Sequence, residues 1–91
     1  MKRYYIVFSG IVQGVGFRWT LMNIAKRHGI TGYCRNLSNG NVEAEIQGEE
    51  EDLNAFLKEC FKPQRFIKIY DYAVKEKPLK EGERDFTPVY Y

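Results

Sequence analysis

The stretch GIVQGVGFR, residues 10–18, separates two different backbone patterns in this chain of 91 residues. Residues 3–9, before it, are mostly β-branched and aromatic, which predicts a largely buried strand. Residues 17–28, after it, place apolar side chains on one stripe of a helix, and Gly29 follows as a terminating glycine. The link between them is rich in glycine and therefore poor in side chains. The stretch is predicted to turn a strand into a helix.

The remainder of the chain repeats the change between strand and helix patterns. The Asn39-Gly40 pair has the chemistry of a hairpin turn and lies between two β-rich runs. Residues 49–52 are acidic, which is favourable at a helix N-terminus. In chain order, the later predicted elements are a strand at 30–35, a strand at 42–46, a helix from 49 that ends before Pro63, a strand at 65–74, a polar loop at 75–84 and a short edge strand at 86–91, where Pro88 is tolerated.

This order of elements, β-α-β-β-α-β, predicts an α+β fold. The predicted architecture is the ferredoxin-like sandwich, an antiparallel sheet with both helices on one face. A length of 91 residues suits one small domain with one core, so residues 1–91 are assigned to a single domain. No internal repeat or low-complexity tract interrupts this arrangement.

The charge balance of the chain points to a small partner. The 14 basic and 12 acidic residues give a formal net charge of +2, which is too weak to indicate nucleic acid or a membrane surface. The apolar run at residues 4–8 is far shorter than the ~20 residues of a membrane span, and it is too short for a signal peptide. We therefore expect a soluble, cytoplasmic protein with no nucleic-acid or membrane partner.

Neither cysteine is expected to carry chemistry. Cys34 and Cys60 form no CxxC pair and have no histidine close in sequence, so the sequence offers no metal-ligand set. The spacing from Cys60 to Arg65 does not match that of a phosphatase-type cysteine. Both cysteines are predicted to be buried small hydrophobes. The only histidine, His28, is predicted to pack at the end of its helix.

The glycine-rich loop has the backbone chemistry of an anion site. Consecutive N–H groups of residues 10–16 are expected to point toward the start of the predicted helix, where the helix dipole also favours negative charge. Arg18 adds a planar fork of donors that matches a tetrahedral oxyanion. The spacing is neither that of a Walker loop nor that of a dinucleotide-binding turn. On these residues alone, an ordinary glycine-rich turn is an equal alternative.

Two stretches of the sequence match signatures of one family. GIVQGVGFR at residues 10–18 resembles the first signature of the acylphosphatase family, G-x-V-Q-G-V-x-F-R, at every fixed position. GYCRN at residues 32–36, with Gly40, Val42 and Gly48, resembles the second. The family has the same ferredoxin-like fold. The resemblance implies hydrolysis of acyl phosphates to a carboxylate and inorganic phosphate, with no metal, no cofactor and no phosphoenzyme.

The resemblance also implies roles for individual residues. By motif position, Arg18 corresponds to the residue that binds the phosphate, and Asn36 corresponds to the residue that holds the attacking water. The backbone N–H groups of the loop are expected to help bind the phosphate; they belong to Gln13, Gly14, Val15, Gly16, Phe17 and Arg18. Positioning and charge stabilisation can suffice for an acyl phosphate, because its leaving group is good. The expected partners are an acyl phosphate and inorganic phosphate, and the expected oligomeric state is a monomer.

Two other functions are compatible with the same fold. Ferredoxin-like domains also bind RNA through aromatic residues on the open sheet face, and this chain has 7 tyrosines and 6 phenylalanines. However, no stretch supplies the K/R-G-F/Y-G/A-F-V-x-F/Y pattern of an RNA-recognition strand. The second alternative is a non-catalytic module that senses phosphate or an acyl phosphate, as acylphosphatase-like segments do inside larger proteins. We expect Asn36 and the full length of the chain to favour the enzyme.

Overall fold

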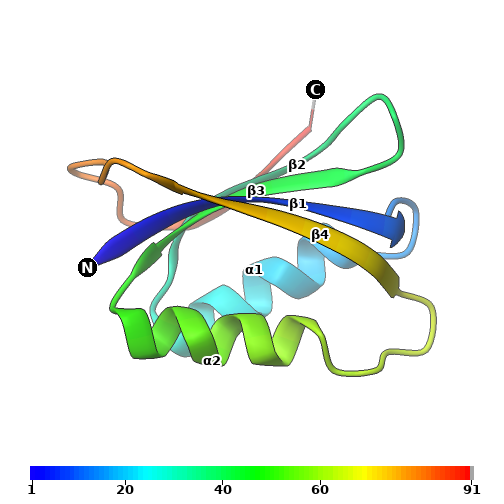
Figure 1. Ribbon diagram of the computed structural model, residues 1–91, viewed down its shortest axis with the longest axis horizontal. Helices are drawn as coiled ribbons and strands as arrows, with labels where there is room; N and C mark the ends of the chain where they lie inside the picture. Colours follow the sequence, from blue (N-terminus) through cyan, green and yellow to red (C-terminus); the bar gives the residue numbers. More distant parts are fainter. Residues whose placement is uncertain (91) are drawn as a thin grey trace.

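The computed structural model describes residues 1–90, in which two helices pack against one face of a five-stranded sheet (Figure 1). This arrangement confirms the predicted α+β ferredoxin-like fold. The elements in chain order are β1 (Lys2–Ile11), α1 (Phe17–His28), β2 (Thr31–Asn36), β3 (Val42–Gly48), α2 (Glu50–Cys60), β4 (Lys68–Lys77) and β5 (Phe86–Val89). No helix within these residues has the length and apolar character needed to cross a bilayer.

The strands lie in the order β4-β1-β3-β2-β5. The pairs β1–β3, β1–β4 and β2–β3 are antiparallel, as predicted, whereas β2 and β5 are parallel. The parallel pair arises because the chain leaves β4 at one edge of the sheet and reaches the other edge beside the start of β2, where Gly32 pairs with Phe86. From there β5 can only run in the same direction as β2. The sheet is therefore mixed, with a short parallel edge.

The boundaries of the last two strands differ from the predicted ones. The strand predicted at 65–74 spans Lys68–Lys77 in the structure. The polar residues 75–77, which were predicted to lie in a loop, therefore belong to this strand. They pair with β1 as far as Arg3, opposite Lys77, and remain exposed or half-exposed because β4 is an edge strand. The predicted strand at 86–91 is Phe86–Val89, and residue 91 lies outside the described part of the chain.

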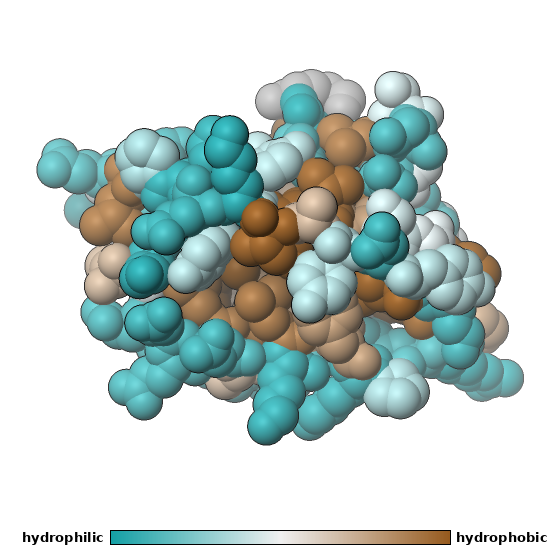
Figure 2. All heavy atoms as spheres, in the orientation of Figure 1, coloured by the Kyte–Doolittle hydropathy of each residue, from teal (hydrophilic) through white to brown (hydrophobic). Residues whose placement is uncertain are grey.

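The hydrophobic core lies between the sheet and the helix layer. Figure 2 shows apolar side chains in a band between these two layers, with hydrophilic residues above and below it. Phe8 of β1 and Phe17 at the start of α1 are both fully buried, and their rings meet edge to face with centroids 5.0 Å apart. This contact fixes the two ends of the glycine-rich loop against the core, so the loop is held at both sides.

A polar network covers part of the opposite face of the sheet. Arg3 is only 3 % exposed, and its guanidinium donates to Glu45 Oε1 at 2.6 Å and to Glu83 Oε1 at 2.7 Å. Gln47 Oε1 accepts from the backbone N–H of Lys80 at 2.8 Å. These bonds attach the segment between β4 and β5 to the open face. The carboxylates on this face make it unfavourable for a phosphodiester backbone.

Glu43 of β3 is the centre of a second cluster on the same face. Its carboxylate is nearly buried and accepts hydrogen bonds from the hydroxyls of Tyr5 at 2.7 Å and Tyr33 at 3.1 Å. Arg35 forms an ion pair with it at 2.8 Å. Burial, together with the hydrogen bond to Glu43, raises the pKa of Tyr5 to about 12, and burial beside Glu43 also raises the pKa of Tyr33.

This cluster predicts a loss of stability in alkali. The unfolded chain releases a tyrosine proton near pH 10, whereas folded Tyr5 keeps its proton to a higher pH. The stabilisation is therefore complete below pH 10 and declines as the pH rises toward 12. We expect Tyr5→Phe to weaken the decline in urea midpoint between about pH 10 and 12. The matched control, Tyr70→Phe, alters an exposed ring and is expected to behave as wild type. An unchanged decline in Tyr5→Phe would contradict this account.

Candidate active site

The glycine-rich loop and the start of α1 leave backbone N–H groups available to a ligand. Gly16 precedes the helix with φ 77°, a left-handed conformation that suits glycine. Among the described residues, no side chain caps this N-terminus, and its first turn has no acidic residue. By contrast, α2 has three acidic residues in its first turn, Glu50, Glu51 and Asp52. The first N–H groups of a helix have no partner within the helix. The N-terminus of α1 is therefore suited to an external anion.

Arg18 lies in this first turn, and the last strand holds its side chain. Its Nη1 donates to the carbonyl oxygen of Val89 at 3.1 Å. Its guanidinium carbon lies 4.2 Å from the centre of the Tyr90 ring. These two contacts come from residues far from Arg18 in sequence and fix the plane of the guanidinium. Within residues 1–90, the side chain of Arg18 donates to Val89 alone, so its other donors can be shared with an oxyanion.

Asn36 is the last residue of β2 and lines the same pocket as Arg18. The pocket has a volume of about 140 Å³, and its walls are Val12, Gly14, Gly16, Phe17, Arg18, Trp19, Asn36 and Tyr90. The Oδ1 atom of Asn36 is buried and has no hydrogen-bond partner among the described residues. A buried carbonyl oxygen without a partner is costly. Its position in a polar pocket makes it available to accept a hydrogen bond from a bound molecule.

The alternation along β2 explains why Asn36 faces the pocket. Cys34 and Asn36 are two residues apart on a strand, so they point to the same face of the sheet. Cys34 is buried on the helix side, and its thiol lies 3.8 Å from the carbonyl oxygen of Arg18. The face that buries Cys34 against α1 therefore also turns Asn36 toward the start of that helix.

The side chain of Gln13 contacts the neighbouring hairpin, whereas the role expected of this residue is that of its backbone N–H group. Its Nε2 donates to the carbonyl oxygens of Leu37 at 2.6 Å and Asn41 at 2.8 Å. These acceptors belong to the turn between β2 and β3. The side chain of Gln13 therefore attaches the loop to the hairpin that bears Asn36. Val15 lines a neighbouring cavity, so the pocket itself takes Gly14, Gly16, Phe17 and Arg18 from the predicted set.

Three residues of the pocket were not singled out from the sequence. Val12 lies within the signature stretch and Trp19 directly follows it, and neither residue type suggests phosphate chemistry by itself. Tyr90 reaches Arg18 only because β5 returns to the edge of the sheet beside β2. The one sequence feature that could have pointed to Tyr90 is that it is an aromatic residue at the end of a predicted strand.

The cysteines and the histidine lie where the sequence predicted. Cys34 and Cys60 are both buried and free. Burial raises the pKa of the Cys34 thiol to about 12 and raises that of Cys60 as well. His28 ends α1, where its Nε2 lies 2.8 Å from Glu59 Oε1 of α2. In the part of the chain that the structure describes, no three His, Cys, Asp or Glu side chains form a group that could hold a metal ion.

Comparison with known proteins identifies the family. A family model described as acylphosphatase matches residues 4–88, which is nearly the whole chain. The chain belongs to the acylphosphatase family. The match confirms the resemblance inferred from the two signatures around Arg18 and Asn36, and it extends the similarity beyond them to β4 and β5.

Individual acylphosphatases resemble the chain over its full length. The acylphosphatase of Clostridium acetobutylicum is 43 % identical over 90 residues, which cover 99 % of each chain. The crystal structure of acylphosphatase from Bacillus subtilis matches with a TM-score of 0.92 and 34 % identity, covering 99 % of this chain and 100 % of that one. The chain is therefore an enzyme of the acylphosphatase type. It also matches 12 % of the longer chain of T. kodakarensis HypF, with a TM-score of 0.87, 36 % identity and 100 % of this chain covered.

Proposed function

We propose that the chain hydrolyses acyl phosphates in the pocket between the glycine-rich loop and Asn36, by direct attack of water on phosphorus. The water oxygen forms a bond to phosphorus as the bond from phosphorus to the bridging oxygen breaks. The products are a carboxylate and inorganic phosphate. The observation that supports this proposal best is the pairing of an uncapped helix N-terminus and Arg18 with the unpartnered Oδ1 of Asn36 in one pocket.

Arg18 and the backbone of the loop are proposed to bind the phosphate. The guanidinium fork and the N–H groups at the start of α1 both attract its negative oxygens. The charge on these oxygens is present in the bound substrate and remains in the transition state. The contacts to Val89 and Tyr90 hold the guanidinium before the substrate arrives, so less orientational freedom is lost on binding.

Asn36 is proposed to orient the attacking water. Its Oδ1 can accept a hydrogen bond from the water and thereby aim the water oxygen at phosphorus. A carboxamide cannot take up the proton. We therefore assign the proton of the water to a phosphate oxygen of the substrate. The carboxylate leaves without protonation, since carboxyl groups ionise near pH 4.

A comparison of two substrates tests this function. We expect hydrolysis of benzoyl phosphate and little hydrolysis of phenyl phosphate. The leaving group of benzoyl phosphate is a carboxylate, whereas phenyl phosphate must release a phenolate, whose parent acid ionises near pH 10. Among the described residues, none that lines the pocket has a carboxyl side chain to protonate such a leaving group. Equal rates with both esters would contradict the proposal. Binding of phosphate with no turnover of any acyl phosphate would instead support the sensing module.

We also expect turnover to withstand EDTA and thiol alkylation. The mechanism assigns no step to a metal ion, and burial keeps the Cys34 and Cys60 thiols protonated at neutral pH. The measurement is the rate of benzoyl phosphate hydrolysis after dialysis against EDTA and, separately, after iodoacetamide treatment of the folded protein. A loss with EDTA that added divalent metal restores would show that the metal-free mechanism is wrong. A folded Cys34→Ser protein that had lost turnover would give the thiol a role.

A further inference from the structure

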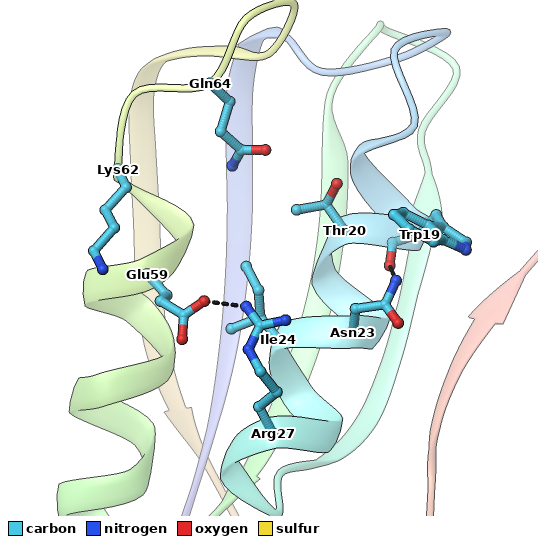
Figure 3. Close-up of a pocket in the computed structure, with 8 residues that line it drawn as sticks. All are labelled: Trp19, Thr20, Asn23, Ile24, Arg27, Glu59, Lys62 and Gln64. Atoms are coloured by element: carbon cyan, nitrogen blue, oxygen red, sulfur yellow. Dashed lines mark hydrogen bonds and ion pairs between the residues drawn. The ribbon is translucent and has the colours of Figure 1, made fainter.

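The phosphate pocket opens onto a second cavity along the start of α1. This cavity has a volume of about 290 Å³ and lies between the glycine-rich loop and the segment from Gln64 to Ile67. Gly16 and Trp19 line both the phosphate pocket and this cavity, so the two are neighbours. We call the second cavity the Trp19 groove. Trp19, Thr20 and Gln64 in turn connect it with a larger cavity of about 470 Å³ between α1 and α2 (Figure 3).

The walls of the Trp19 groove are largely apolar and open to solvent. Trp19 is 66 % exposed and Phe66 is 64 % exposed, although both are large aromatic residues. Val15 adds an aliphatic side chain from the glycine-rich loop. Exposed aromatic residues beside an anion pocket lose unfavourable contact with water when an apolar group covers them. The groove is therefore built for contact with a flat or apolar ligand.

We propose that the Trp19 groove is the subsite for the acyl part of the substrate and that it selects aromatic or apolar acyl groups. The inference rests on the proposed function, because it takes the phosphate of the substrate to lie beside Arg18. In an acyl phosphate, one bridging oxygen joins the phosphate to the acyl carbon. The acyl group must therefore leave the phosphate pocket through an adjoining opening, and the groove shares two walls with that pocket.

The polar groups around the groove disfavour a cationic occupant. In the larger cavity, Arg27 is already paired with Glu59, and the side chain amide of Asn23 donates to the carbonyl oxygen of Trp19 at 2.9 Å, as Figure 3 shows. Arg65 also lines the groove, and its guanidinium carbon lies 5.1 Å from the centre of the Phe66 ring. Of the residues that the structure describes, none that lines the groove is acidic. A cationic acyl group therefore has no counter-ion there, and an apolar group displaces no ion pair.

Phosphonate analogues provide a test that does not depend on turnover. We use the analogues of benzoyl, acetyl and succinyl phosphate in which a CH₂ group replaces the bridging oxygen. Calorimetry is expected to show that the benzoyl analogue binds about 10-fold more tightly than the acetyl analogue, a difference of about 1.4 kcal/mol. Trp19 is the only tryptophan, so its emission reports on the groove and on the phosphate pocket that it also lines. We expect the benzoyl analogue to shift this emission more than the acetyl analogue does, because only the benzoyl ring covers the groove.

Variants of Phe66 locate the preference. Phe66→Ala is expected to bind the benzoyl analogue about 5-fold more weakly and the acetyl analogue as wild type does, while Phe66→Tyr keeps the ring and the preference. Tyr70→Ala removes an aromatic ring that is 72 % exposed but does not line the groove, and it is expected to change neither affinity. In turnover, the ratio of kcat/KM for benzoyl phosphate to that for acetyl phosphate falls by the same factor in Phe66→Ala.

Several results would overturn the assignment of the groove. These are equal binding of the benzoyl and acetyl analogues, an equal loss of both in Phe66→Ala, or tighter binding of the succinyl analogue, which carries a carboxylate. The proposed function fails separately. If the protein prefers the benzoyl analogue but hydrolyses no acyl phosphate, the proposed function is wrong and the assignment of the groove stands. If it hydrolyses acetyl and benzoyl phosphates equally well, the proposed function stands and the assignment of the groove is wrong.

Discussion

Arg18→Ala is expected to lower kcat/KM for an acyl phosphate about 10³-fold, equivalent to about 4 kcal/mol of transition-state stabilisation. The guanidinium is proposed to contact the phosphate both in the bound substrate and in the transition state. The variant should therefore show a higher KM as well as a lower kcat. The same loss is expected in the affinity for inorganic phosphate, measured as a competitive inhibitor. Steady-state kinetics with benzoyl phosphate, with and without added phosphate, provide all three quantities.

Lysine is expected to restore little of this activity. The Arg18 fork donates to the carbonyl oxygen of Val89 and stacks on Tyr90 while it presents further donors to the pocket. A lysine ammonium is a point charge and cannot make these contacts in one plane. Arg84→Ala is the matched control, because it removes the same charge from an exposed residue that does not line the pocket. Activity of Arg18→Ala within a few-fold of this control would contradict the assignment.

The parts of the site that could be predicted from the sequence are determined by residues that lie close together along the chain. The glycine pattern and the helical stripe after it place the loop, Gly16 and Arg18 at the start of α1, and the structure has them there. Asn36 could be assigned to the end of a strand because the Asn39-Gly40 turn follows it. Each of these features is determined by residues within about one turn or one strand of it.

The parts that could not be predicted depend on contacts between distant residues. Arg18 and Val89 meet although they are 71 positions apart, and only the parallel pairing of β5 with β2 brings them together. The extent of β4 is a similar case. Residues 75–77 have the composition of a loop, and their pairing with β1 makes them a strand. Composition does not report such pairing, because edge strands tolerate charged residues on both faces.

The Trp19 groove also depends on residues that are distant in sequence. Trp19 and Val15 belong to the signature region, while Phe66 follows α2. The sequence pattern placed Phe66 in a predicted strand at 65–74. In the structure it precedes β4, and its ring is exposed beside α1. The sequence pattern could place the phosphate site but not the surface next to it, since that surface forms where α2 returns the chain to the start of α1.

Asn36→Ala is expected to lower kcat about 10³-fold and to leave the binding of inorganic phosphate almost unchanged. The residue is proposed to orient water and not to hold phosphate, so the two effects separate in this variant and not in Arg18→Ala. The measurements are kcat with benzoyl phosphate and the inhibition constant of phosphate. Asn36→Asp is a useful second variant, because it keeps the size of the side chain but adds a negative charge beside the phosphate, and it is expected to weaken phosphate binding.

The thermal midpoint of Asn36→Ala separates the proposed role from a structural one. As an ordinary residue at a strand end, Asn36 would contribute about 1 kcal/mol to stability, and alanine would leave turnover intact. The buried Oδ1 makes no hydrogen bond to the described residues, so alanine removes an unpaired acceptor and not a structural contact of that atom. We therefore expect the midpoint to stay the same or to rise while kcat falls. A polar atom that costs stability and supports turnover is typical of an active site. A folded Asn36→Ala protein with nearly normal kcat would show that the water-positioning role is wrong.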